Sequence, residues 1–277
     1  MNARRSDSHR SRESVDSSAG DVVPRRQPIS PKRTISANRV PRGARSLELP
    51  VATLPQPDET TCGPTCLHAI YAYWGDDEPL AAVIRRARRL DHGGTYAVFL
   101  GCDALRRGYS VRIYTYNLTV FDPSWFGPHK VDLRDRLSRQ QRAKSDPRIY
   151  VATEGYLEFL ELGGRIRFAN LSRDLIGGIL RRGIPLLAGL SATYLYRQPR
   201  ESGPDDTPDD VHGFPSGHFV VIAGFDHETG KLLVVDPYQP HRYGPVLRYW
   251  VNADRVVAAI LLGIVTHDAN MLVVYPS

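Results

Sequence analysis

The spacing of apolar residues predicts a helix that begins close to residue 62. Four apolar residues share one helical face, at i, i+3, i+4 and i+7: Leu67, Ile70, Tyr71 and Trp74. Gly75 is a suitable C-terminal stop, and Pro64 fits the first turn, where a missing N–H costs no intrahelical bond. The helix is therefore expected to start beside Cys62.

Similar patterns along the rest of the chain predict further helices and strands. Helices are expected over residues 79–90, 96–107, 130–143, 147–162, 173–182 and 252–262. Runs rich in β-branched and aromatic residues predict strands over residues 110–116, 165–169, 186–195, 218–225, 231–236 and 271–275, after an extended arm at 46–54. Residues 197–217 are predicted to form a long polar loop. Because helices come first and antiparallel strands later, we expect an α+β fold.

Residues 1–46 differ from the rest in having no aromatic residue and no apolar periodicity. They hold eleven Arg or Lys and four Asp or Glu, so the remaining residues carry a net charge of −1 within a chain total of +6. We expect a disordered basic tail over 1–46 and one folded domain over 47–277. Because the folded part is nearly neutral, no nucleic-acid partner is expected.

The cysteine count and the apolar runs indicate a compartment. The chain has three cysteines, a small and odd number that argues against a disulfide framework and fits a reducing environment. The N-terminus lacks the apolar core of a signal peptide, and the longest apolar run, residues 256–265, is too short to span a bilayer. We expect a soluble cytoplasmic protein with no membrane span. The sequence carries no signal for the oligomeric state.

Cys62 has the surroundings of a catalytic thiol. At a helix N-terminus, unpaired backbone N–H groups and the positive end of the dipole favour a thiolate. Gly63 follows it and would let a substrate backbone approach closely. Gln56 lies six residues earlier, and its amide could donate to an oxyanion together with the backbone N–H of Cys62.

A predicted hairpin brings a base and an acid to one end of the sheet. His218 opens one apolar strand and Asp236 ends the next, with the turn at 226–230 between them. If that turn closes the hairpin, positions 218 and 236 are near-opposite. An Asp beside a His fixes its tautomer and stabilises the imidazolium. Thiol, base, orienting acid and oxyanion donor are the four groups that amide hydrolysis by a cysteine needs.

Three runs, taken together, carry a resemblance. They are QPDETTCGPTCL at 56–67, GHFVVIAG at 217–224 and VDP at 235–237, and they resemble the peptidase C39-like family of the papain-like cysteine peptidase clan. The resemblance implies a papain-like fold, in which a helix start holding the cysteine packs on an antiparallel sheet carrying the histidine and aspartate. It covers residues 50–116 and 184–275, so we assign a helical insertion around 117–183.

The resemblance also implies roles for individual residues. Cys62 would be the nucleophile, His218 the base, Asp236 the orienting acid and Gln56 the oxyanion-hole donor. We expect Gly63 and Gly217 to lie beside the substrate. The implied activity is hydrolysis of a peptide or amide bond through a thioester acyl-enzyme, with a peptide or protein as substrate and no cofactor.

Two other functions use the same residues. An acyl or peptidyl transferase would share the first half-reaction, so the sequence does not separate it from a hydrolase. A non-catalytic module that binds a peptide in the same cleft is a third possibility. The complete Gln-Cys-His-Asp set argues against this binding module.

The remaining reactive side chains have simpler interpretations. Cys66 and Cys102 are expected in the helical core. No metal site is expected, because no second Cys or His pair follows at zinc-finger spacing. The polar loop contains an acidic cluster formed by Asp205, Asp206, Asp209 and Asp210. This cluster lacks the glycine and the distal Glu of an EF-hand calcium site. His212 is the alternative base if His218 is not the partner of Cys62.

Overall fold

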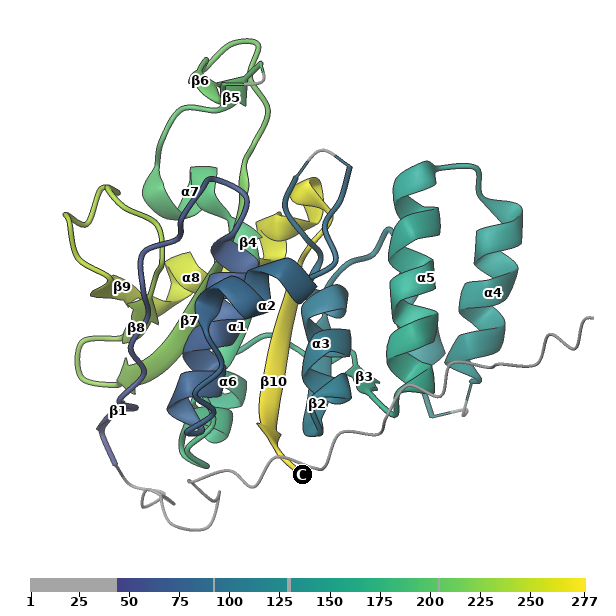
Figure 1. Ribbon diagram of the computed structural model, residues 1–277, viewed down its shortest axis with the longest axis horizontal. Coiled ribbons are helices and arrows are strands. Elements are labelled where there is room, and N and C mark those ends of the chain that lie inside the picture. The colour runs from purple at the N-terminus through teal and green to yellow at the C-terminus, as the bar shows by residue number, and fades with distance from the viewer. Residues whose placement is uncertain (1–43, 92, 129–130, 204) are drawn as a thin grey trace, which may run out of the picture.

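One mixed, mostly antiparallel sheet forms the centre of the molecule (Figure 1). The structure is a computed structural model, and it describes residues 44–91, 93–128, 131–203 and 205–277. The strand order is β3-β2-β10-β4-β7-β8-β9, and β1 also pairs with β7. Only β2 and β3 run parallel among these pairs. The strands are β1 (Ser46–Glu48), β2 (Tyr109–Thr115), β3 (Arg165–Arg167), β4 (Leu186–Ser191), β7 (Gly217–Asp226), β8 (Lys231–Val235), β9 (Arg248–Asn252) and β10 (Asn270–Pro276).

Helices cover both faces of this sheet. Figure 1 shows α1 (Cys62–Tyr73), α2 (Leu80–Arg86) and α3 (Ala97–Arg106) in front of it, with α6 (Arg173–Leu180) and α8 (Ala253–Leu262) behind. Every residue of β4 is buried, and so is the central part of β7. Strands buried on both faces read as continuous apolar runs, which is why their sequences show little alternation.

The helix that begins at Cys62 is held against the sheet by polar contacts as well as by its apolar face. The Cys66 thiol donates to the carbonyl of Phe219 on β7 at 3.2 Å. At the other end, the Trp74 indole donates to the carbonyl of Val274 on β10 at 3.0 Å. The predicted start near residue 62 is confirmed, and these contacts fix the position of that start relative to β7.

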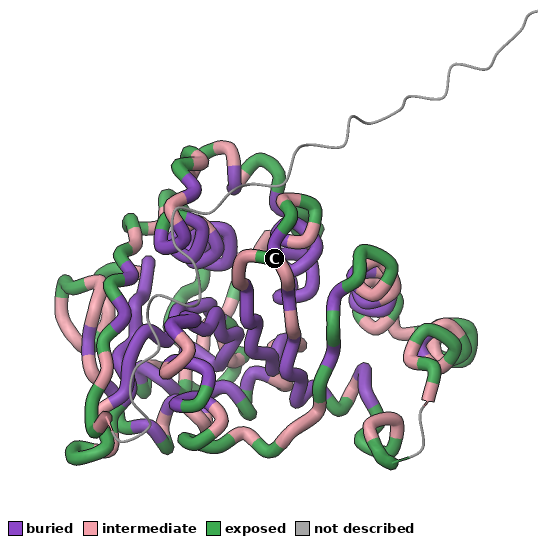
Figure 2. The backbone as a smooth tube through the Cα atoms, turned by 90° about the horizontal axis from the view of Figure 1, so that it is seen from below, coloured by how far each residue is buried: buried purple, intermediate pink, exposed green. Residues whose placement is uncertain are grey.

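The predicted helical stretch between residues 117 and 183 is present. It contains α4 (Leu133–Ala143) and α5 (Pro147–Glu161), followed by β3 and α6. Asp132 and Asp146 cap α4 and α5 by accepting backbone N–H groups. Figure 2 shows these two helices at the edge of the molecule, where exposed positions are frequent. The assignment of this stretch as an insertion stays a prediction.

The observed elements differ from the predicted ones in three places. The predicted strand over 186–195 is wrong beyond Ser191, whose hydroxyl accepts the N–H of Tyr194 and so starts α7 (Ala192–Tyr196). Strand β9 was not predicted, because its Arg and Asn ends hide a short apolar run. The tail expected over 1–46 lies outside the described residues as far as position 43, and Ser46 already belongs to β1.

Candidate active site

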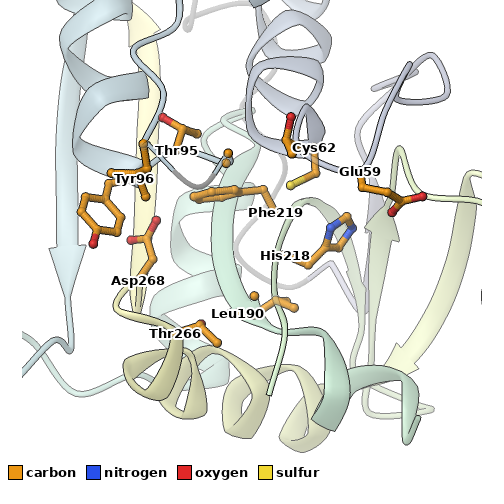
Figure 3. Close-up of a pocket in the computed structure, with 14 residues that line it drawn as sticks. Glu59, Cys62, Thr95, Tyr96, Leu190, His218, Phe219, Thr266 and Asp268 are labelled. Carbon is orange, nitrogen blue, oxygen red and sulfur yellow. The ribbon is translucent and has the colours of Figure 1, made fainter. Parts of the chain in front are cut away.

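Cys62 is the first residue of α1 and is held there by a tight turn (Figure 3). The Asp58 carboxylate accepts the backbone N–H of Thr60 at 2.9 Å, and the Thr61 hydroxyl donates to the carbonyl of Asp58 at 3.0 Å. The side chain of Cys62 is buried but lines a cavity. Its backbone N–H belongs to the first turn, where helical N–H groups have no partner within the helix.

His218 lies near the start of β7, on the strand that α1 packs against. The expected pairing of position 218 with position 236 is not the observed register. The two strands already pair at Asp226 and Lys231 beside the turn, and the bulge between Ile222 and Gly224 takes back one residue of that shift. Asp236 lies just past the end of β8, and its side chain still reaches His218.

The Asp236 carboxylate is fully buried and accepts four hydrogen bonds. One oxygen accepts from His218 Nε2 at 2.8 Å and from the backbone N–H of Tyr238 at 3.0 Å. The other oxygen accepts from the hydroxyls of Tyr196 and Tyr249. A carboxylate has about four acceptor positions, so Asp236 is saturated and its orientation is fixed.

The pair formed by His218 and Asp236 favours the charged form of both groups. Burial alone would lower the pKa of His218, but the charge and hydrogen bond of Asp236 raise it to about 10. Burial alone would raise the pKa of Asp236, but the charge of His218 and the donated hydrogen bonds lower it. At neutral pH the ring is therefore an imidazolium beside a carboxylate.

The second ring nitrogen of His218 is left for Cys62. Asp236 occupies Nε2, so the nitrogen on the other side of the ring is Nδ1. Figure 3 shows the sulfur of Cys62 and the ring of His218 in the same cavity, on α1 and β7 respectively. The nearby Cys62 side chain also contributes to the raised pKa of His218. The two residues predicted as nucleophile and base are thus neighbours.

Gln56 approaches the site from the loop before α1. Its backbone N–H donates to the carbonyl of Pro237 at 2.9 Å, which places it next to Asp236 in space. Its side-chain nitrogen donates to the carbonyl of Asp58 at 2.9 Å, which uses one of the two amide hydrogens. Gln56 lines the larger of the two cavities at the site, while Cys62 lines the smaller. Its role at an oxyanion stays a prediction.

The two predicted glycines have different surroundings. Gly63 is buried, and a Cβ there would lie 2.8 Å from the Thr95 side chain and 3.1 Å from that of Phe219. Close packing of α1 therefore explains this glycine, and it does not line either cavity of the site. Gly217 lines both cavities, next to His218.

The site opens into a cavity on each side of the Cys62–His218 pair. A cavity of about 270 Å³ extends between α1 and β7 towards Thr95, Tyr96 and Asp268. A second cavity of about 880 Å³ extends under the segment that carries β5 (Glu201–Ser202) and β6 (Thr207–Pro208). Both are lined by Glu59, Thr60, Gly217 and His218, so together they form one cleft across the pair.

The other cysteines and the alternative base lie away from this chemistry. Cys66 is fully buried, and burial raises the pKa of its thiol well above the usual value. Burial likewise raises the pKa of Cys102 to about 12. His212 is exposed and pairs with Asp209 at 3.3 Å. Over the described ranges, no three His, Cys, Asp or Glu side chains converge as a metal site.

The sequence reasoning missed the residues that hold the acid. Tyr196 and Tyr249 come from α7 and β9, which are separated from Asp236 by 40 and 13 residues, and no local pattern marks either tyrosine. Asp268, at the far end of the smaller cavity, was also missed. The sequence signal that could have drawn attention to Asp268 is an acidic residue between two apolar runs.

Comparisons with known proteins return fold neighbours only. No family model and no curated protein matches the chain. The chain is similar to a C39-like peptidase from Bacillus anthracis, at 13% identity and a TM-score of 0.43, covering 84% of this chain and 99% of that one. It is also similar to the peptidase domain of Streptococcus ComA (13%, TM-score 0.40, 82% and 99%) and to xylellain, a cysteine protease from Xylella fastidiosa (12%, TM-score 0.40, 90% and 91%).

These neighbours agree with the resemblance to C39-like and papain-like peptidases seen in the sequence. In the part of the chain that the structure describes, no helix is long and apolar enough to cross a membrane.

Proposed function

We propose that this protein is a cysteine hydrolase that cleaves a peptide or amide bond through a thioester on Cys62. One observation carries the proposal: His218 donates Nε2–H to a saturated, buried Asp236 and turns its other side to a thiol at a helix N-terminus. A structural histidine does not need an orienting carboxylate held by two tyrosines. The arrangement matches the needs of thiol catalysis.

The proposed first half-reaction forms the acyl-enzyme. The Cys62 thiolate attacks the carbonyl carbon of the scissile bond, and the C–N bond breaks as the amine leaves. The His218 imidazolium gives its Nδ1 proton to that amine nitrogen. Asp236 keeps the ring in position and stabilises its positive charge before the transfer.

The second half-reaction releases the acid. Neutral His218 takes a proton from water, the resulting hydroxide attacks the thioester carbonyl, and the thiolate leaves. The oxyanion of each tetrahedral intermediate would be held by the backbone N–H of Cys62 and by the remaining amide hydrogen of Gln56. If an amine entered in place of water, the same site would act as a transferase.

The test is to trap the acyl-enzyme with a peptidyl electrophile and to measure the intact mass of the full chain. We expect one adduct, lost in Cys62→Ala and kept in Cys66→Ala. Cys66 is the matched control because it lies one turn along the same helix and is buried without reaching the cavity. An adduct that survives Cys62→Ala would overturn the assignment. Product analysis with and without added amines separates hydrolysis from transfer.

The location and domain boundaries also remain proposals. We keep the cytoplasm as the expected location because the three cysteines are all free and buried, as a reducing compartment favours. We also keep one folded domain from 47 onward with a helical insertion around 117–183.

A further inference from the structure

The cleft on both sides of Cys62 is acidic, although the chain as a whole is basic. Five carboxylates line its two cavities: Glu59, Glu201, Asp205, Asp206 and Asp268. Among the residues that the structure describes, no lysine or arginine lines either cavity, and His218 is the one basic side chain there. A cleft lined by one sign of charge concentrates ligands of the opposite sign.

Asp268 places a buried carboxyl group at the end wall of the smaller cavity. Its side chain is buried, and Figure 3 shows it across the cavity from Cys62 and His218, beside Tyr96. One of its oxygens accepts the backbone N–H of Ala97 at 2.6 Å, and the other accepts the amide of Asn270. These two bonds come from neutral donors and use two of about four acceptor positions, so acceptor capacity remains for a group that enters the cavity.

Apolar side chains form the walls between Cys62 and Asp268. Leu90, Leu190, Phe219 and Tyr96 line this cavity together with the backbone of Gly93 and Gly94. Apolar walls that end in a buried carboxylate suit a side chain with a long apolar stem and a cationic tip, which lysine and arginine have. A neutral apolar side chain would leave the carboxylate buried without a cation.

The larger cavity is also lined by carboxylates, but these are exposed or half-buried. Asp205 and Asp206 are exposed and Glu201 is half-buried, on the segment that carries β5 and β6. Burial raises the pKa of Glu201, and the nearby charges of Asp206 and Glu59 raise it further. Burial and the charges of Glu59 and Glu201 likewise raise the pKa of Tyr238. The carboxylates therefore act on one another through a shared negative field.

We propose that the cleft selects a basic peptide, with one lysine or arginine side chain inserted towards Asp268 and further basic residues along Glu201, Asp205 and Asp206. This proposal rests on the proposed function, because it names the substrate class of the same site. Asp268 sets the specificity at one position, and the three exposed or half-buried acids add a salt-dependent attraction. This chemistry has two sources: the basic segment of this chain at residues 22–45, and basic segments of other proteins.

The test uses internally quenched octapeptides in which each position in turn is arginine, norleucine or glutamate. The full-length protein is compared with three full-length variants: Asp268→Asn, the double variant Glu201→Gln/Asp206→Asn, and Glu228→Gln. Glu228 is the matched control, because it is an exposed acid in the turn between β7 and β8, outside both cavities. The same peptides are also titrated onto the Cys62→Ser chain, so that binding is measured without catalysis.

We expect the wild-type protein to prefer arginine over norleucine at one position by about tenfold or more, as for a buried charged contact. Asp268→Asn should remove that preference while norleucine peptides are still cleaved. The double variant should weaken the preference at neighbouring positions about threefold and reduce its salt dependence. Glu228→Gln should change neither.

Several results would overturn the proposal. One is equal cleavage and binding of arginine and norleucine peptides by the wild-type protein. Another is an arginine preference that Asp268→Asn leaves intact. If Asp268→Asn does not fold, an unchanged preference in the double variant counts against the proposal instead. Arginine-selective binding to Cys62→Ser without any cleavage by the wild type would contradict the proposed function and leave the basic-peptide specificity standing.

The source of the peptide is tested on the full-length protein by intact mass. Loss of an N-terminal fragment at a rate independent of protein concentration would identify the chain's own basic segment as the occupant. A stable full-length mass together with cleavage of arginine peptides would assign the cleft to other proteins.

Discussion

Asp236 and Asp268 are both buried carboxylates at the candidate site, and they are held in opposite ways. Asp236 faces His218, and the charge of that ring lowers its pKa despite burial. Among the described residues, Asp268 accepts hydrogen bonds from the neutral donors Ala97 and Asn270, and burial raises its pKa to about 7. A buried carboxylate with an internal cation stays charged, whereas one without a cation is poised to gain a proton or to accept a cation from outside.

The contrast assigns different work to the two ends of the site. Asp236 is saturated by four donors and holds the ring of His218 in position. Asp268 keeps acceptor capacity and faces a cavity. Positioning requires a group whose partners are complete, and recognition requires one whose partners are incomplete. Removing the cation of His218, the carboxylate of Asp236 or the proton of Asp268 should therefore have different effects on activity and stability.

The largest effect is expected from His218→Ala, which makes Asp236 resemble Asp268 by removing its cation. Loss of a general base typically costs about 10²–10⁴-fold in rate, and we expect kcat/KM to fall within that range. Breaking a buried ion pair also costs about 3–5 kcal/mol of stability. Peptide hydrolysis and urea unfolding measure the two losses.

His241→Ala is the control for His218→Ala. The ring of His241 stacks on that of Tyr196, with the ring centroids 5.6 Å apart, but His241 does not line the cavity that holds Cys62. Activity should survive this change. Equal losses in the two histidine variants would show that packing, not base catalysis, explains the first result.

The next effect is expected from Gln56→Ala. Loss of one oxyanion donor costs about 10²–10³-fold in kcat, and KM should change little because the donor acts in the transition state. Steady-state kinetics on one peptide separate the two constants. A raised KM with unchanged kcat would mean that Gln56 binds substrate in the larger cavity instead.

A smaller effect is expected from replacing Asp236. In Asp236→Ala the His218 N–H and two tyrosine hydroxyls lose their acceptor, and a buried unsatisfied donor costs about 1–3 kcal/mol. If this cost falls on the transition state, kcat drops roughly 10- to 100-fold. Asp236→Asn should lose less, because its carbonyl still accepts from the ring. Identical rates for the two variants would remove the orienting role.

The smallest effect is a pH dependence of stability that comes from Asp268. Its pKa is raised on folding, so between about pH 4 and pH 7 the folded state holds a proton that the unfolded state has lost. Stability should therefore fall as pH rises through this window, by at most about 1.4 kcal/mol per pH unit for one proton.

Asp268→Asn should flatten that slope, and this is measured by urea unfolding at several pH values. The His218 contribution has another window: its pKa is raised, so the stability it adds is complete below about pH 6.5 and is lost as pH rises towards about 10. An unchanged slope between pH 4 and 7 in Asp268→Asn would show that Asp268 is already charged in the folded protein.

Local patterns predicted most elements but not their exact partners. The helix at Cys62 was predicted from one apolar face, and the hairpin of β7 and β8 from two apolar runs around a turn. The register was predicted two residues away from the observed one, because the strands pair as far as Asp226 and Lys231 and so leave a shorter turn than the sequence indicated. Strand 186–195 was predicted too long, because a single serine starts α7 within its apolar run.

The residues of the candidate site could be predicted from the sequence where an element end marks them, and their roles stay predictions. Cys62, His218 and Asp236 stand at element ends, where a helix start or strand end identifies them. Tyr196, Tyr249 and Asp268 reach the site from α7, β9 and the segment before β10, and only tertiary structure brings them together. Gly63 packs closely against Thr95 and Phe219, which accounts for a glycine there, and its place beside the substrate stays a prediction.

The most direct test of the central claim is the rate of iodoacetamide alkylation at Cys62 as a function of pH, in the wild-type protein and in His218→Ala. The thiolate is the reactive form, and His218 stays protonated beside it at neutral pH. We predict rapid labelling of Cys62 at pH 6 in the wild-type protein, with Cys66 and Cys102 unlabelled, and a profile displaced to higher pH in His218→Ala. A profile that does not move would contradict the pairing of Cys62 with His218.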